Sequence, residues 1–514
     1  MRLIRYQYIW AITAALVSCA TAWPFFSNPV ASAPKQKPLR VEQHNTGRSL
    51  YPYTLREHDP NAEICVAGSK QFTGMVSVSD EKKLFFWFFE SRNDPSSSPV
   101  TIWLNGGPGG PSLFGLFLEI GPCVLNSHNN GTVFEKNSWT EFSNVLFIDQ
   151  PAGVGFSTVN GSNSGGPDNV VEAAEDFTRF LITFFGQVFP QYAANPLHFA
   201  GESFAGKYIP GYVHYMEQRR KQGLLPSLPT IQSIILVDAV IDTVSSSVLS
   251  LYDHFCDVDD EIGAPTTKKP FNTTACDALE NAAPECQRLD ALCRDTYDGN
   301  VCQISHEVCF DTLGGWLMDD VREGGRDPYD DRKACGPNPP ICEGFEGEGY
   351  AAYVNRSEVK IALGFEEDYV FSGINWDLNQ RWERSKDIFV PTTRELAYIL
   401  DETPIRVLVL NGNNDIIVNT EGQKRVYDHL SWRRQASFRM HRFRNWTWPN
   451  EDGKMTVGGQ FKTANDTETV DKLAFMTINE AGHTSPGDQR QAVTWLMGCW
   501  TGAPPQGADE RCFV

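Results

Sequence analysis

Short apolar runs recur along the chain and alternate with segments of helical periodicity. Residues 71–79 and 82–90 follow closely on one another, which predicts two paired strands, the second buried on both faces. Residues 168–185 carry apolar side chains at the spacing of an amphipathic helix. Further buried strands are predicted at 101–104, 144–149, 197–200, 233–240, 405–410 and 473–478. Strands that alternate with helices predict an α/β protein with a mostly parallel sheet and helices on both faces.

The alternation breaks off between residues 243 and about 364, where eight cysteines lie close together in sequence. This segment has few apolar residues with which to build a core, so we expect an insertion stapled by disulfides. The eight are Cys256, Cys276, Cys286, Cys293, Cys302, Cys309, Cys335 and Cys342. The sequence does not choose among their possible pairings. Neither C-x-x-C nor H-E-x-x-H occurs, so no metal site is predicted.

The first 22 residues have the pattern of a secretory signal peptide. Arg2 and Arg5 precede an apolar stretch that ends in the A-x-A sequence Ala20-Thr21-Ala22. We therefore expect a mature protein that is extracellular or in a vacuolar or lysosome-like compartment. No later stretch reaches the roughly 18 apolar residues of a membrane span, so no membrane partner is expected. Loss of Cys19 would leave an even twelve cysteines, which suits an oxidising compartment.

The net charge and the glycosylation sequons limit the expected partners and describe the expected surface. The net charge of −20 over 514 residues argues against nucleic acid as a partner. Six N-x-S/T sequons predict a glycosylated surface. They begin at Asn130, Asn160, Asn272, Asn355, Asn445 and Asn465. The oligomeric state does not follow from any of these features.

Residues 197–210, LHFAGESFAGKYIP, have the pattern of a strand that turns sharply into a helix around one serine. Ser203 would lie at the tip of this turn in a strained conformation, with small neighbours that let the backbones pass. The strict G-x-S-x-G form is absent because the second glycine comes one position late, at Gly206. Ser203 is therefore a candidate nucleophile whose partners must lie elsewhere in the chain.

Two further strand ends supply those partners. Active sites of such sheets lie at the carboxyl ends of the strands, where Asp415 and His483 also follow buried runs. Ser203, Asp415 and His483 occur in the chain order of the α/β-hydrolase triad. Asp149 and Asp242 also follow strands and are the alternative acids. His198 lies inside a predicted strand, which favours a core position.

The glycine-rich segment that follows Leu104 is a candidate oxyanion site. A tetrahedral intermediate needs two backbone N–H donors, and the N–H that follows the nucleophile, on Phe204, is one of them. The second is expected in Asn105–Gly110, where missing side chains let a substrate approach the backbone. A phosphate-binding loop is the alternative, but Gly-Lys-Ser/Thr and a complete G-x-G-x-x-G are absent.

Four motifs in order resemble the serine carboxypeptidase family. They are WLNGGPG (103–109), FIDQPAGVGFS (147–157), GESFAGKYIP (201–210) and AGHTSPGD (481–488). The resemblance runs from about residue 71 to 500, with the cysteine-rich insertion matched loosely. It implies a metal-free and cofactor-free exopeptidase that releases one C-terminal amino acid at a time and works at acidic pH.

The resemblance also gives roles to residues near the triad. It implies that the substrate's terminal carboxylate is bound by Asn105, Gly106, Glu119 and Glu202. It implies that Gly107 joins Phe204 as an oxyanion donor. Two acids can face a carboxylate only if they keep protons, and clustered like charges raise carboxyl pKa values.

Several positions depart from the family pattern. Gly110 replaces a cysteine, so the family's disulfide from this loop to the insertion is not expected. Phe204 replaces a tyrosine, Thr484-Ser485 replaces Met-Val, and Val237-Asp238-Ala239 replaces Gly-Asn-Gly. None removes a catalytic group, but together they leave the side-chain specificity open.

The sequence thus predicts a secreted serine carboxypeptidase with an α/β-hydrolase fold and a disulfide-rich cap, acting on the C-termini of peptides and proteins. The expected organisation is a signal peptide (1–22), a first part of the core (23–242), the cap with the return to the core (243–395), and a second part of the core (396–514). A family-derived acyltransferase and a non-catalytic binding or protective protein are the alternatives.

Overall fold

The computed structural model describes residues 51–160, 166–225, 228–256, 271–322, 325–335, 342, 348–464 and 472–502. The predicted signal peptide at residues 1–22 and the sequon at Asn465 lie outside these ranges. The predicted boundaries after residues 242 and 395 fall within the described residues, whereas the boundary after residue 22 does not. No helix among the described residues is both long enough and apolar enough to cross a membrane.

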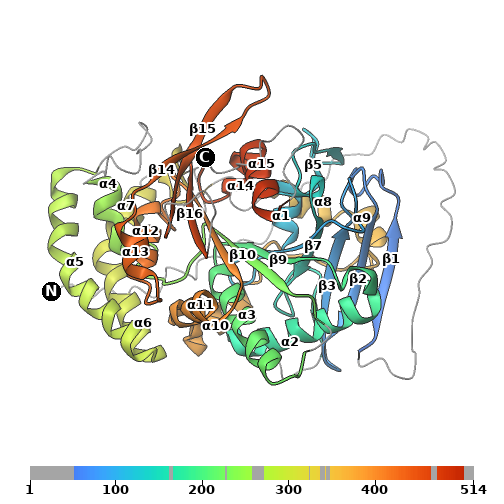
Figure 1. Cartoon of the computed structure of the whole chain (residues 1–514), viewed down its shortest axis with the longest axis horizontal. Helices are drawn as coiled ribbons and strands as arrows, with labels where there is room; N and C mark the ends of the chain where they lie inside the picture. The colour runs from blue at the N-terminus through green and yellow to red at the C-terminus, as the bar shows by residue number, and fades with distance from the viewer. Residues whose placement is uncertain are drawn as a thin grey trace, which may run out of the picture.

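One large sheet organises the described residues (Figure 1). Its strand order is β1-β2-β3-β7-β4-β9-β10-β13-β16-β15-β14, with β8 paired to β3. The six strands from β7 to β16 in this order are parallel, whereas β1–β3 at one end and β14–β15 at the other pair antiparallel. The strands are β1 (Tyr53–His58), β2 (Gln71–Ser77), β3 (Lys82–Phe89), β4 (Val100–Leu104), β7 (Asn144–Asp149), β8 (Thr158–Val159), β9 (Leu197–Glu202), β10 (Ile231–Val237), β13 (Arg406–Gly412), β14 (Arg444–Pro449), β15 (Met455–Thr463) and β16 (Leu473–Ile478).

Helices cover both faces of the sheet, because every central strand is apolar on both sides. One hydrophobic cluster packs α2 (Val170–Thr183), α3 (Ala205–Lys221), α11 (Thr393–Glu402) and α12 (Thr420–His429) on one face. A second cluster packs α1 (Leu113–Leu118), α8 (Glu348–Val354), α9 (Ser357–Leu363) and α15 (Arg490–Thr501) on the other. The remaining helices of the core are α10 (Trp376–Ser385), α13 (Gln435–Met440) and α14 (Ser485–Asp488). This is the α/β-hydrolase fold that the sequence predicts.

The insertion is more regular than its sequence indicates. It contains helices where the hydrophobic pattern predicts none: α4 (Leu251–Phe255), α5 (Thr273–Thr296), α6 (Gly299–Cys309) and α7 (Gly315–Arg322). Helices α5 and α6 lie side by side at one end of the molecule (Figure 1). Two short hairpins, β5 (Cys123–Leu125) with β6 (Thr132–Phe134) and β11 (Arg326–Asp327) with β12 (Asp330–Ala334), complete the small elements.

All eight cysteines of the insertion pair with one another, as Cys256–Cys276, Cys286–Cys309, Cys293–Cys302 and Cys335–Cys342. A fifth disulfide, Cys65–Cys123, lies outside the insertion. On α5 the apolar positions Leu279, Cys286 and Cys293 recur every seven residues and are all buried. The cysteines therefore serve as core residues as well as cross-links, which is why a search for ordinary apolar periodicity misses this helix.

Candidate active site

Ser203 lies at a tight turn between β9 and α3, with a backbone φ of +61°. Its N–H donates to Val237 O at 3.0 Å and its carbonyl accepts from Val240 N at 2.9 Å, so the turn is tied to β10. A Cβ at Gly201 would come within 2.4 Å of Leu104 O, and one at Gly206 within 2.5 Å of Val240 O. Glycine is required at both positions by close backbone approach, including the displaced second glycine of the motif.

His483 and Asp415 form a buried hydrogen-bonded pair. Nδ1 of His483 donates to Asp415 Oδ2 at 2.7 Å, and both side chains are at most 1% exposed. The other oxygen, Oδ1, accepts the backbone N–H of Val418 at 3.1 Å, which fixes the carboxylate. Because β9, β10, β13 and β16 are neighbours in the sheet, the loops that carry Ser203, Asp415 and His483 meet at one edge.

The alternative residues make other contacts. Asp149 accepts the N–H of Phe156 at 2.9 Å, and Asp242 forms an ion pair with Arg294 at 3.3 Å. His198 is buried and its Nδ1 shares a hydrogen bond with Ser233 Oγ at 2.7 Å, as expected of a core histidine.

Two glutamic acids meet beside the serine. Glu119, at the end of α1, and Glu202, the last residue of β9, are in side-chain contact and are 0% and 3% exposed. Burial is the largest cause that raises both pKa values, and the neighbouring charge of Glu119 raises the pKa of Glu202 further. Two carboxyls in contact at this depth share at least one proton.

Asn105 connects this acid pair to the glycine-rich loop. Its Oδ1 accepts from Trp103 Nε1 at 2.8 Å and from Gly115 N at 2.9 Å. Its Nδ2 donates to Glu119 Oε1 at 3.1 Å. The two accepted bonds define the amide orientation, so the NH₂ group faces the acids.

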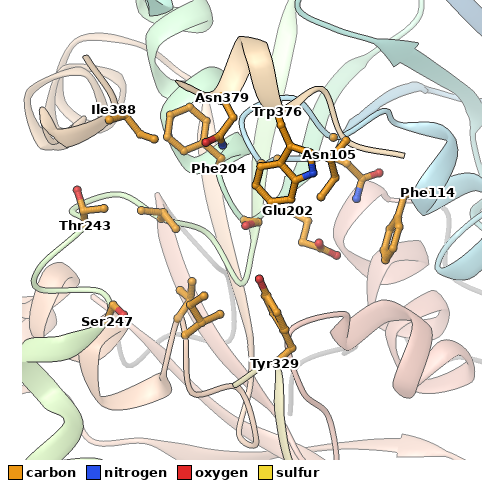
Figure 2. A pocket seen from close by; sticks show the side chains of 18 of the residues that line it. Asn105, Phe114, Glu202, Phe204, Thr243, Ser247, Tyr329, Trp376, Asn379 and Ile388 are labelled. Atoms are coloured by element: carbon orange, nitrogen blue, oxygen red, sulfur yellow. The ribbon is translucent and has the colours of Figure 1, made fainter. Parts of the chain in front are cut away.

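A pocket opens over these groups. Six of the predicted site residues line it: Asn105, Gly106, Gly107, Glu202, Ser203 and Phe204. A Cβ at Gly106 would lie 2.4 Å from Phe204 N, so the glycine-rich loop passes directly against the turn that carries Ser203. Figure 2 shows Asn105 and Glu202 on one side of this pocket, with Phe204 above and Tyr329 below. Glu119 accepts a hydrogen bond from Asn105 and is not among the lining residues.

The β11–β12 hairpin of the insertion contacts the loops that carry Asp415 and His483. No pattern in the sequence predicts these contacts. Pro328 O accepts the N–H groups of Ile416 and Ile417 at 3.2 and 3.0 Å, and Tyr329 O accepts His483 N at 2.7 Å. The ring of Tyr329 lies 5.4 Å from that of His483. A residue in the insertion can be assigned to the site only once its place in the fold is known.

Arg332 of the same hairpin forms an ionic bridge. It pairs with Asp330 at 2.7 Å and with Asp488 at 2.9 Å, and it donates to the carbonyl of Glu480. Asp488 Oδ2 also accepts the N–H of Gly482 at 2.8 Å. Gly482, the residue before His483, is therefore linked through Asp488 to Arg332 of the insertion.

Asp238 is a second residue whose place the sequence left open. It follows β10 with φ of +43° and is fully buried. Its carboxyl accepts from Gly412 N at 2.6 Å and from Ser485 Oγ at 2.5 Å, so it joins the loops on either side of the Asp415–His483 pair. Burial, followed by the charge of Asp415, raises its pKa well above the usual value.

The sequons differ in accessibility. Asn130, Asn160, Asn272 and Asn445 are exposed. Asn355 is half-buried, and its Nδ2 donates to Ala351 O at 3.0 Å and Phe371 O at 2.9 Å. A glycan on Asn355 would compete with these two bonds.

Among the described residues, no group of three or more His, Cys, Asp or Glu side chains is placed to hold a metal ion.

Comparisons with known proteins agree on one family. A family model described as serine carboxypeptidase matches residues 60–502. Carboxypeptidase Y homolog A of Neosartorya fischeri is 30% identical over 504 residues, which cover 92% of this chain and 87% of that protein. Its counterpart in Fusarium vanettenii is 32% identical over 471 residues, covering 89% and 80%.

Among solved structures, the prohormone-processing carboxypeptidase Kex1Δp of Saccharomyces cerevisiae matches with a TM-score of 0.68 at 21% identity. The match covers 86% of this chain and 92% of that one. At this identity the likeness supports the fold.

Proposed function

The chain belongs to the serine carboxypeptidase family, and from this premise we propose that it hydrolyses the last peptide bond of peptides and proteins through Ser203, His483 and Asp415. The observation that carries the proposal is the buried Glu119–Glu202 pair beside Asn105, at the pocket that Ser203 lines. A protonated acid pair can bind a carboxylate, and a C-terminus is the place where a peptide presents one.

In the proposed reaction Ser203 Oγ attacks the carbonyl carbon of the last peptide bond while His483 Nε2 takes its proton. The 2.7 Å bond from His483 Nδ1 to Asp415 supports this role, because it orients the ring and stabilises it once charged. His483 then gives the proton to the leaving amino group, and one amino acid departs. Water attacks the acyl-enzyme in the same way and restores Ser203.

The tetrahedral intermediate carries an oxyanion, for which we propose the N–H groups of Gly107 and Phe204 as donors. Both residues line the pocket, and the approach of Gly106 to Phe204 N brings the two segments together. Removing one such donor from an enzyme typically costs about 3–4 kcal/mol of transition-state stabilisation.

Recognition of the terminal carboxylate is assigned to Asn105, Gly106, Glu119 and Glu202. A protonated carboxyl donates a hydrogen bond to the substrate carboxylate, whereas an ionised one repels it. Because burial raises both pKa values, and the charge of Glu119 raises that of Glu202 further, the donating form persists to higher pH than in an ordinary glutamic acid. Activity favoured at acidic pH, and a secreted or vacuolar location, are consistent with this chemistry.

Amidating the C-terminus of a peptide substrate tests the carboxylate assignment. We expect kcat/KM to fall by at least about 100-fold, since a neutral amide leaves buried donors unpaired. Acetylating the N-terminus of the same peptide is the matched control and should change kcat/KM only a few-fold. Released amino acid is quantified for acid, amide and acetylated forms.

Equal turnover of acid and amide would contradict the assignment and favour an esterase or endopeptidase. Ester formation with an added alcohol, without release of free amino acid in water, would favour the acyltransferase. Covalent labelling by a fluorophosphonate, lost in Ser203→Ala, identifies the nucleophile and tests the non-catalytic alternative.

A further inference from the structure

The active-site pocket has two sides of different chemistry. Figure 2 shows Asn105, Phe114 and Glu202 on one side and Thr243, Ser247 and Ile388 on the opposite side. If the terminal carboxylate is bound at Asn105 and Glu202, the leaving residue occupies that side. The residue before the scissile bond then extends to the opposite side, which we call the acyl-side half. We assign to it Thr243, Ser247 and Ile388, together with the further lining residues Val240, His306 and Phe310.

None of the described residues that line the acyl-side half has a charged side chain. Three of its six residues are apolar and two end in hydroxyl groups. Across the whole pocket, Glu202 is the one acidic side chain among the described lining residues, and none of them is a lysine or arginine. A charged substrate side chain placed in the acyl-side half would lose water without gaining an ion-pair partner, which is costly.

His306 is the sixth residue and comes from α6 of the insertion. Its ring centroid lies 4.1 Å from that of Phe310 and 4.8 Å from that of Phe389. Its Nδ1 has no hydrogen-bond partner in the part of the chain that the structure describes. Burial, with a smaller contribution from the charge of Lys207, lowers its pKa to about 3. The imidazole is therefore neutral at pH 6.

We propose that the acyl-side half selects an uncharged side chain for the residue before the scissile bond, with His306 as a specificity-determining residue. This inference rests on the proposed function, because it takes the position of the carboxylate from it. In this arrangement the core supplies the catalytic residues. A helix of the disulfide-linked insertion supplies the residue that selects the substrate side chain.

Substrates that differ only in charge test the proposal. N-blocked dipeptides with the same C-terminal residue are compared in two matched pairs, norleucine against lysine and citrulline against arginine, at pH 6. We expect kcat/KM to be at least about 100-fold lower for the charged member of each pair. Equal values within a pair would overturn the selection while leaving the carboxypeptidase reaction intact. If no C-terminal residue is released from any of the four, the proposed function fails, and this inference with it.

A charge placed at His306 tests the residue itself. His306→Asp should raise the lysine-to-norleucine ratio of kcat/KM at least about tenfold, because it supplies the missing partner. His306→Phe should keep the preference for norleucine, since the wall stays uncharged. His128→Asp, at an exposed position of the β5–β6 hairpin, makes the same charge change and should leave the ratio unchanged.

The ratio is internal to each variant, so a partly unfolded preparation does not alter it. An unchanged ratio in His306→Asp would remove His306 as a determinant. The four wild-type substrates test the selection without any variant.

Discussion

Glu202 meets two requirements at once. Its backbone ends β9 and leads into the strained turn of Ser203, while its carboxyl contacts Glu119 in the interior. Burial is the main cause of its raised pKa, and the charges of Glu119, Asp238 and Asp415 add to it. A single residue thus couples the position of the proposed nucleophile to the proton that the proposed carboxylate recognition needs.

Replacing Glu202 by glutamine should change the pH profile. An amide donates a hydrogen bond at every pH, so the alkaline decline of kcat/KM should weaken, whereas in the wild type it follows loss of the shared proton. We expect the ratio of kcat/KM at pH 8 to that at pH 5 to rise about tenfold, equivalent to about one pKa unit. Glu175→Gln on the surface of α2 is the control, and an unchanged decline in Glu202→Gln would contradict the assignment.

At the scale of elements, the β11–β12 hairpin connects the insertion to the loops that carry Asp415 and His483. It accepts backbone N–H groups that follow Asp415 and the N–H of His483 itself, and Arg332 ties it to Asp488. The insertion is therefore part of the support of the active site as well as a wall of the pocket.

Removing the Arg332 bridge should lower kcat more than it changes KM. In Arg332→Ala the loop that carries His483 loses its ionic contacts, so we expect kcat to fall about tenfold, with a matching loss in the rate of fluorophosphonate labelling. Arg332→Lys should recover part of the loss. Arg288→Ala on α5 breaks an exposed pair with Glu285 in the same insertion and should have no effect. An intact labelling rate in Arg332→Ala would rule out a positioning role.

The elements also show what the sequence can and cannot predict. Central strands such as β4 and β16 are buried on both faces, so their sequences are continuous apolar runs. The outer strands β1, β14 and β15 are not predicted from the sequence because exposed positions mix with buried ones. The motifs that follow central strands placed the candidate site. Tyr329 and His306 reach the pocket from a segment whose helices are stabilised partly by cysteines, so no local pattern marks them.

Across the whole molecule, buried acids make stability depend on pH. Burial raises the pKa of Asp149 to about 7 and that of Asp290 to about 8, and it raises those of Glu202 and Asp238 well above their usual values. The folded chain then binds more protons than the unfolded chain. The stability that such a group adds is complete below its unfolded pKa and is lost as the pH rises through its folded pKa.

The free energy of unfolding should therefore fall between pH 6.5 and pH 8, by about 1.4 kcal/mol per pH unit for each carboxyl still protonated in the folded state. Buried histidines such as His198, whose pKa is lowered to about 3, oppose this trend only below about pH 6.5. Urea denaturation across this range measures the slope. Asp290→Asn should flatten it, and stability that stays constant or rises would contradict the prediction.

The order of strands in the sheet differs from their order in the chain, and this affects how the protein is made. Strand β10 pairs with β13, which the ribosome supplies only after the whole insertion. Until then the edge of β10 that faces β13 presents unpaired backbone N–H and C=O groups, and such an edge favours pairing with other chains. Ser203 precedes the insertion in the chain, whereas Asp415 and His483 follow it. If the proposed triad is correct, an enzyme that shortens other chains can become active only after the part of its own chain that follows the insertion has been made.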